Sequence, residues 1–161
     1  ALSGLLVGQN LQTKQHEIFK ALIEATAFGS LMIIDQIEKH GVSIKEIIAI
    51  GGLSQSYVIM QIYADITGRK IKVLKSDQVC AVGSAILAAC NNKEGYLNLK
   101  TTQKKMSVKV KKIYHPNMQN NKIYKRIYKL YSNLHDVFGR VNNKKSLHHI
   151  MKELILIRNL Y

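Results

Sequence analysis

A short apolar run that ends in two glycines constrains this 161-residue chain more than any other feature. Residues 46–50, EIIAI, are too few and too apolar for a surface helix, so they predict a buried strand. Gly51 and Gly52 follow directly, and the apolar residues after them recur with helical spacing. Adjacent glycines after a strand indicate either a sharp turn or a backbone against which something must lie.

The segments around this unit alternate between helix and strand patterns. A helix is expected over 15–40, apolar on nearly every side and therefore buried on most of them. A second helix is expected to end at Gly68, and residues 69–74, RKIKVL, alternate as a strand with one solvated face. The small-sided segment 79–90 predicts a third helix. This alternation is typical of an α/β fold in which helices cover a sheet.

The later part of the chain has a different character. Residues 91–116 are expected to form a linker, and a long helix is expected from 117 to about Phe138, followed by a last helix over 146–160. The expected organisation is therefore an α/β domain over 1–90, the linker over 91–116, and a C-terminal helical extension over 117–161 that packs on the domain.

The charge is distributed unevenly between the two parts. Residues 1–99 hold nine Lys/Arg and eight Asp/Glu, whereas residues 100–161 hold fifteen and two. A segment with a net charge of +13 is attracted to polyanions, and tyrosines lie among its lysines. The alternative is a solvated lysine face on a helix whose tyrosines pack inward, because Lys122, Lys125 and Lys129 lie off the apolar stripe. We favour this alternative and expect no specific nucleic-acid partner.

The remaining features favour a cytoplasmic setting. Cys80 and Cys90 stand ten residues apart in one expected helix, which is too far for a disulfide within that helix. No apolar run approaches the roughly 20 residues of a membrane span, so no membrane partner is expected. The chain lacks an initial methionine and a basic signal-peptide start, so we expect it to be part of a longer protein. The adjacent His148 and His149 do not have zinc-ligand spacing, and no metal ligands are assigned.

A strand that ends in Gly-Gly before a helix presents backbone N–H groups and a positive helix end, which together suit a phosphate. The missing Cβ atoms also leave room for a base or ribose. Neither a GxGxxG nor a GxxxxGK[ST] pattern is present. Spacing alone therefore favours an ordinary tight turn.

The sequence also resembles a known family. The segment GLLVGQNLQTKQHEIFKALIEATAFGSLMII is similar to the C-terminal signature of the FGGY carbohydrate kinases. The residues that fall on that signature are Gly4, Leu6, Gly8, Glu17, Ile18, Ala21 and Glu24. The segments GGL…MQIYADITGR, AVGSAI and LHDVFGR are most similar to family members that phosphorylate the ketopentose L-ribulose.

The resemblance implies an actin-like (ribonuclease H-like) fold, of which this chain is the C-terminal part on the ATP side, followed by C-terminal helices. It implies transfer of the γ-phosphoryl group of MgATP to L-ribulose, giving L-ribulose 5-phosphate, as in L-arabinose catabolism. ATP and Mg²⁺ are the implied cofactors, and L-ribulose would be bound through the preceding domain. A homo-oligomer is compatible with the sequence. The residues expected to lie against the nucleotide are Gly51, Gly52, Leu53, Ser54 and Ser56.

No catalytic residue is expected in this chain, because the family's catalytic aspartate matches none of Asp35, Asp65 and Asp77 and is expected upstream of Ala1. Asp65 is predicted to be a structural polar group near a helix end. The loop after Gly52 looks one residue shorter than in the family pattern. Two alternatives stay open: a degenerate, non-catalytic kinase fragment, and a basic nucleic-acid-binding module.

Overall fold

Three strands form the sheet, in the spatial order β1 (Glu46–Ala49), β2 (Lys70–Leu74) and β3 (Val110–Tyr114). β1 runs parallel to β2 with Ile47 opposite Ile71, and β3 runs antiparallel to β2 with Tyr114 opposite Ile71. The computed structural model describes residues 4–91, 98–139, 146–147 and 149–159. The first two strands were predicted from the sequence, and the predicted α/β class is confirmed.

Helix α2 (Tyr57–Thr67) covers one face of this sheet. Its Met60 and Ala64 pack against Ile71, Val73 and Tyr114, and all five are buried. Because side chains alternate along a strand, the lysines of β2 are directed to the opposite face, as the alternating sequence predicted.

α2 ends where the sequence predicted, at Gly68 in the left-handed conformation (φ 65°). A Cβ atom there would lie 3.1 Å from the side-chain nitrogen of Asn121. Both the positive φ and this close contact therefore favour glycine at the position.

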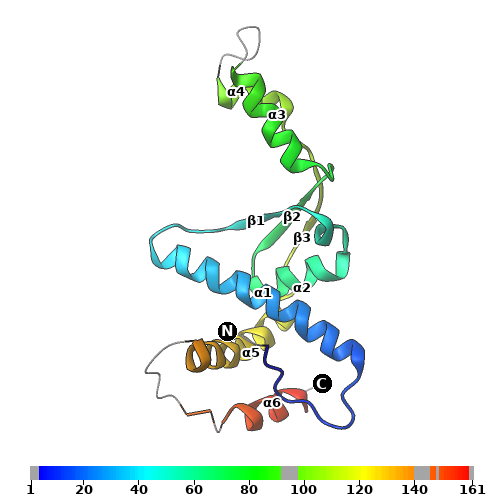
Figure 1. Ribbon diagram of the computed structural model, residues 1–161, viewed down its shortest axis with the longest axis vertical. Coiled ribbons are helices and arrows are strands. Elements are labelled where there is room, and N and C mark those ends of the chain that lie inside the picture. The colour runs from blue at the N-terminus through cyan, green and yellow to red at the C-terminus, as the bar shows by residue number, and fades with distance from the viewer. Residues whose placement is uncertain (1–3, 92–97, 140–145, 148, 160–161) are drawn as a thin grey trace.

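Helices α1 (Gln15–Lys39) and α5 (Met118–Gly139) both pack against α2, and α5 lies farther from the sheet than α1 does (Figure 1). The buried Phe28 of α1 contacts the rings of Tyr124, Tyr128 and Tyr131, with centroid distances of 5.4 to 6.1 Å. The hydroxyl of Tyr124 donates to Glu24 at 2.8 Å, and that of Tyr128 donates to Asp35 at 2.6 Å. Burial, reinforced by these carboxylates, raises the pKa of both phenols.

Helices α3 (Val79–Asn91) and α4 (Leu99–Met106) pack on each other in an arm that projects from the sheet (Figure 1). At the other end of the molecule, α6 (Ile150–Arg158) packs on α5 through Leu130, Ile150 and Ile157. The segment 140–145 between these two helices lies outside the described residues.

The linker expected over 91–116 is corrected by the structure, since α4 and β3 lie inside this range. β3 was missed because VKKIY is exposed at four of its five positions, so it shows no alternation of buried and exposed residues. The strand lies at the edge of the sheet, where lysines are common.

The burial expected of β1 and α1 is also corrected. β1 is the other edge strand, and only Ile47 and Ala49 pack on the core, whereas Ile48 is 56% exposed. α1 buries the face that carries Phe28 and Leu31 against α2 and α5, and leaves Phe19 65% exposed. Residues 4–8 have no regular structure.

Asp65 joins α2 to α5 through a buried carboxylate, and its side chain is only 3% exposed. Oδ1 accepts hydrogen bonds from the backbone N–H of Asn117 and from Gln61, both at 2.8 Å. Oδ2 accepts from the side chain of Asn120 at 2.8 Å, and the Asp65 carbonyl accepts from Asn121 at 2.7 Å. The negative charge therefore lies at the positive N-terminal end of α5, where it is stabilised. The predicted structural role of Asp65 is confirmed.

We predict that Asp65→Ala lowers the free energy of unfolding by about 1–3 kcal/mol, because the partly buried N–H donors of Gln61, Asn117 and Asn120 lose their common acceptor. Asp77→Ala, at an exposed position, should change it by less than about 0.5 kcal/mol. Urea unfolding followed by circular dichroism measures both. Equal stability of the two variants would contradict the role assigned to Asp65.

Candidate nucleotide half-site at the glycine turn

The turn after β1 has a backbone conformation that glycine alone adopts readily. Gly51 has φ 88° and ψ −178°, and the short 3₁₀ helix η1 (Gly52–Gln55) begins at the next residue. Ser54 closes the turn, because its backbone N–H (3.1 Å) and its hydroxyl (2.7 Å) both donate to the Gly51 carbonyl. The predicted sharp turn therefore occurs at the first glycine.

The five residues predicted to bind nucleotide lie together at this turn. Gly51, Gly52 and Leu53 are exposed, whereas Ser54 and Ser56 are half-buried. Ser56 is the N-cap of α2, and its hydroxyl oxygen lies 3.5 Å from the backbone nitrogen of Ile59. A Cβ atom built on Gly52 meets no atom within 4 Å, so the surface beside it is open.

Two features of the turn suit a phosphate or a ribose. The first N–H groups of η1 and α2 have no acceptor within their own helices, and the α2 dipole adds a partial positive charge. The open backbone at Gly52 allows close approach without displacing a side chain.

A polar brace fixes the segment that leads into β1. The guanidinium of Arg69 donates to the Ile44 carbonyl at 2.8 Å, to the Thr67 carbonyl at 2.7 Å and to Glu38 at 2.6 Å. Glu38 also accepts the backbone N–H of Ile44 at 3.1 Å. The bond from Arg69, followed by that from Ile44, lowers the pKa of the Glu38 carboxyl group. The brace connects the end of α1, the start of β1 and the α2–β2 turn, so it positions the strand that carries Gly51.

A hollow of about 900 Å³ lies elsewhere, on the side of α2 that faces α1 and β3. It does not include the glycine turn, which is consistent with a turn that forms only one wall of a site. No group of three or more His, Cys, Asp or Glu residues that could hold a metal occurs in the described part of the chain.

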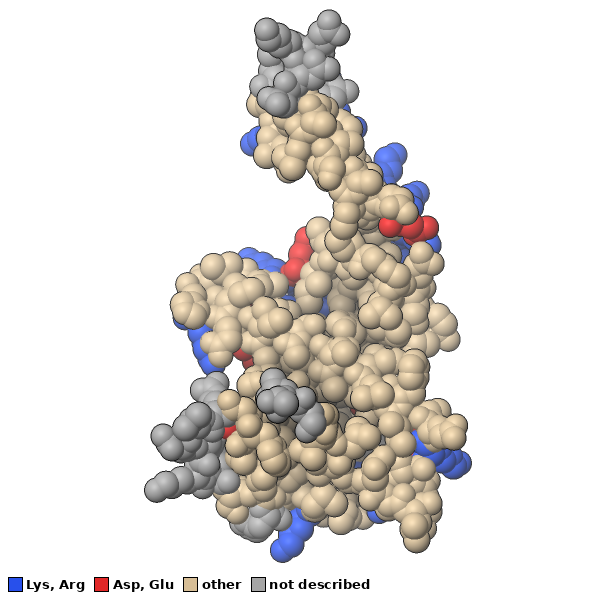
Figure 2. All heavy atoms as spheres, in the orientation of Figure 1, with Lys and Arg blue, Asp and Glu red and all other residues tan. Residues whose placement is uncertain are grey.

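The lysines of α5 form a solvated face while its tyrosines pack inward, which is the alternative favoured from the sequence. Lys122, Lys125 and Lys129 are exposed, whereas Tyr124 and Tyr128 pack inward on Phe28. On the face drawn in Figure 2 the basic side chains lie in several separate places.

The two cysteines of the chain, Cys80 and Cys90, are free thiols. Among the described helices, none combines the length and apolar character of a membrane span.

Comparison with known proteins identifies the class to which this fold and turn belong. The model of the C-terminal domain of the FGGY family of carbohydrate kinases matches residues 1–91. The chain belongs to this family, and the resemblance noted in the sequence is confirmed.

Ribulokinases are among its relatives within the family. The chain is 40% identical to the ribulokinase of Halalkalibacterium halodurans over 163 aligned positions, which cover 99% of this chain and 28% of the relative. It is 43% identical to that of Geobacillus thermodenitrificans over 146 positions, which cover 88% and 26%. The chain therefore spans about a quarter of the length of these relatives.

Solved structures show the same fold. Xylulose kinase from Rhodospirillum rubrum superposes with a TM-score of 0.72 at 24% identity, over 85% of this chain and 28% of that one. Plasmodium falciparum glycerol kinase with ADP superposes with a TM-score of 0.64 at 25% identity, over 86% and 26%. The fold is thus that of the C-terminal part of FGGY kinases, as predicted.

We predict that Gly51→Ala destabilises the protein by about 1–3 kcal/mol, because alanine is strained at φ 88°. Gly52→Ala is the matched control. Its φ is not positive and its Cβ meets open space, so it should change stability by less than about 0.5 kcal/mol. Thermal unfolding of the two variants measures the difference. Indistinguishable melting temperatures would mean that Gly51 is not required for the turn.

Proposed function

We propose that this chain is the ATP-side, C-terminal portion of a ribulokinase-like enzyme that transfers the γ-phosphoryl group of MgATP to L-ribulose, giving L-ribulose 5-phosphate. The observation that carries the proposal is the Gly51-Gly52 turn, which stands in a chain about 40% identical to ribulokinases over almost its whole length. We further propose a cytoplasmic setting and a place in L-arabinose catabolism, as the family resemblance implies.

The glycine turn would contribute backbone rather than side chains to the nucleotide. N–H groups of η1 would face the ribose and phosphates, and the open surface at Gly52 would let the nucleotide approach. Ser54 holds the Gly51 carbonyl, so its role would be to keep the turn in shape. Ser56 is the N-cap of α2 and has a weak hydrogen bond at 3.5 Å, which leaves its hydroxyl free to donate to a nucleotide.

This chain would therefore supply one wall of the ATP site, and the sugar pocket and catalytic base would come from the preceding part of a longer protein. Phosphoryl transfer depends mainly on positioning and on neutralising charge, so a backbone wall is a useful contribution without a catalytic side chain. Mg²⁺ would arrive with the phosphates of ATP, and this chain would hold it only through them.

The shorter loop after Gly52 keeps the degenerate fragment as a second candidate. Both candidates share the fold, and they differ in whether the turn still binds nucleotide. The nucleic-acid-binding alternative has less support, because the tyrosines among the lysines are engaged in the core.

Titration calorimetry with MgATP separates these candidates. We predict saturable binding to the chain that is weakened at least about tenfold, or about 1.4 kcal/mol, by Gly52→Asp. The new carboxylate should repel the phosphates without straining the backbone, since its position meets open space.

Gly4→Asp is the matched control, because it makes the same change where a Cβ also meets open space. It should bind MgATP like the parent chain. Equal weakening in both variants, or no binding to the parent chain, would contradict a nucleotide half-site at Gly52 and favour the degenerate fragment.

A further inference from the structure

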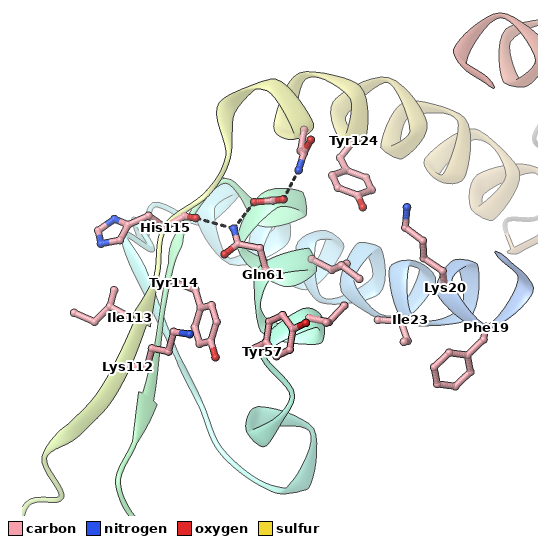
Figure 3. A pocket seen from close by; sticks show the side chains of 14 residues that line it. Phe19, Lys20, Ile23, Tyr57, Gln61, Lys112, Ile113, Tyr114, His115 and Tyr124 are labelled. Carbon is pink, nitrogen blue, oxygen red and sulfur yellow. Dashed lines mark hydrogen bonds between the residues drawn. The ribbon is translucent and has the colours of Figure 1, made fainter. Parts of the chain in front are cut away.

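A wide groove of about 900 Å³ runs along α2, and its lining includes none of residues 51–56 of the glycine turn. Its floor is the exposed side of α2, and its walls are the first half of α1 and the edge strand β3, with the start of α5 at one end (Figure 3). Four segments far apart in the sequence therefore meet at one hollow. The nucleotide role proposed above does not use it.

Two aromatic side chains of this groove are exposed rather than packed in the core. Tyr57 at the start of α2 is 68% exposed, and Phe19 on the α1 wall is 65% exposed. Tyr114 and Tyr124 also line the groove from β3 and α5 (Figure 3), but Tyr114 is buried in the core and Tyr124 packs on Phe28. A planar apolar ligand would gain stacking or edge contacts with the exposed ring of Tyr57.

A positive charge accompanies the rings. The ammonium of Lys112 lies 4.8 Å from the centroid of the Tyr114 ring, and among the described residues it has no carboxylate partner. Lys20 lies on the opposite wall, and its contact with Glu24 is long, at 3.5 Å. Glu24 is also engaged by the Tyr124 hydroxyl.

The carboxylate that lines the groove is already hydrogen-bonded within the protein. Asp65 is the one carboxylate among the lining residues, and it is buried with three N–H donors on its oxygens. Gln61 is held between Asp65 and the His115 carbonyl. The accessible surface of the groove therefore combines ring faces with an excess of cations.

We propose that this groove binds a flat aromatic ligand that carries a phosphate or carboxylate group. The ring lies against the exposed ring of Tyr57, and the anionic group pairs with the Lys112 ammonium. The volume is within the range of small-molecule sites, and a few polar groups that surround an apolar floor are typical of such sites.

Calorimetry with three probes tests this proposal. 1-Naphthyl phosphate carries both a ring and a charge, 1-naphthol carries the ring alone, and inorganic phosphate carries the charge alone. We expect saturable binding of 1-naphthyl phosphate at least about tenfold tighter than that of either single-feature probe. 1-Naphthoate tells whether a carboxylate replaces the phosphate.

Two neighbouring lysines provide the matched variants. Lys112→Gln should weaken binding of 1-naphthyl phosphate about fivefold or more, whereas Lys111→Gln, which removes the same charge outside the groove lining, should change it less than about twofold. Tyr57→Leu should weaken binding while leaving the charge unchanged.

The experiment also separates this groove from the glycine turn. Gly52→Asp should leave the affinity for 1-naphthyl phosphate unchanged, so failure of the nucleotide proposal does not affect the result. Equal effects of the two lysine variants, equal affinity for 1-naphthol and its phosphate, or no binding of 1-naphthyl phosphate would each overturn the proposal.

Discussion

The buried carboxylate of Asp65 is the contact on which the arrangement of the other elements depends. Asp65 is only 3% exposed, and burying a charge destabilises the fold unless the charge is hydrogen-bonded. Here three N–H groups donate to the carboxylate. Two of these donors come from the start of α5, more than fifty residues along the chain. The carboxylate therefore fixes where α5 begins against α2, and α5 in turn covers Phe28 of α1.

The position of the glycine turn depends on contacts that hold both α2 and β1. α2 is held on the sheet by Met60 and Ala64, and the Arg69 brace ties its C-terminal turn to the segment before β1. Because β1 and α2 are both held in place, the turn between them has little conformational freedom. The exposed backbone at Gly52 is therefore held in one orientation. A preorganised backbone wall loses less entropy when it binds a nucleotide.

The sequence predicted what local patterns encode. The β1–turn–α2 unit, the end of α2 at Gly68 and the structural role of Asp65 follow from spacing and residue type within a few positions. The partners Asn117 and Asn120 were not predictable, because no local signal connects them to Asp65. β3 was missed because the adjacent Lys111 and Lys112 interrupt the alternation of apolar and polar residues. The groove was missed because it is assembled from four segments that are distant in the sequence. The burial expected of β1, and of most sides of α1, was wrong because an apolar sequence does not reveal which face of an element has a packing partner.

The most direct measurement uses a chimera in which this chain replaces the matching 28% of Halalkalibacterium halodurans ribulokinase. Steady-state kinetics would be recorded at varied ATP and varied L-ribulose, with and without Gly52→Asp. The account predicts that the chimera phosphorylates L-ribulose and that Gly52→Asp raises the KM for ATP about tenfold while the KM for L-ribulose is unchanged. A folded chimera that shows no turnover, or whose KM for ATP is insensitive to Gly52→Asp, would contradict the claim that this chain forms a wall of the ATP site.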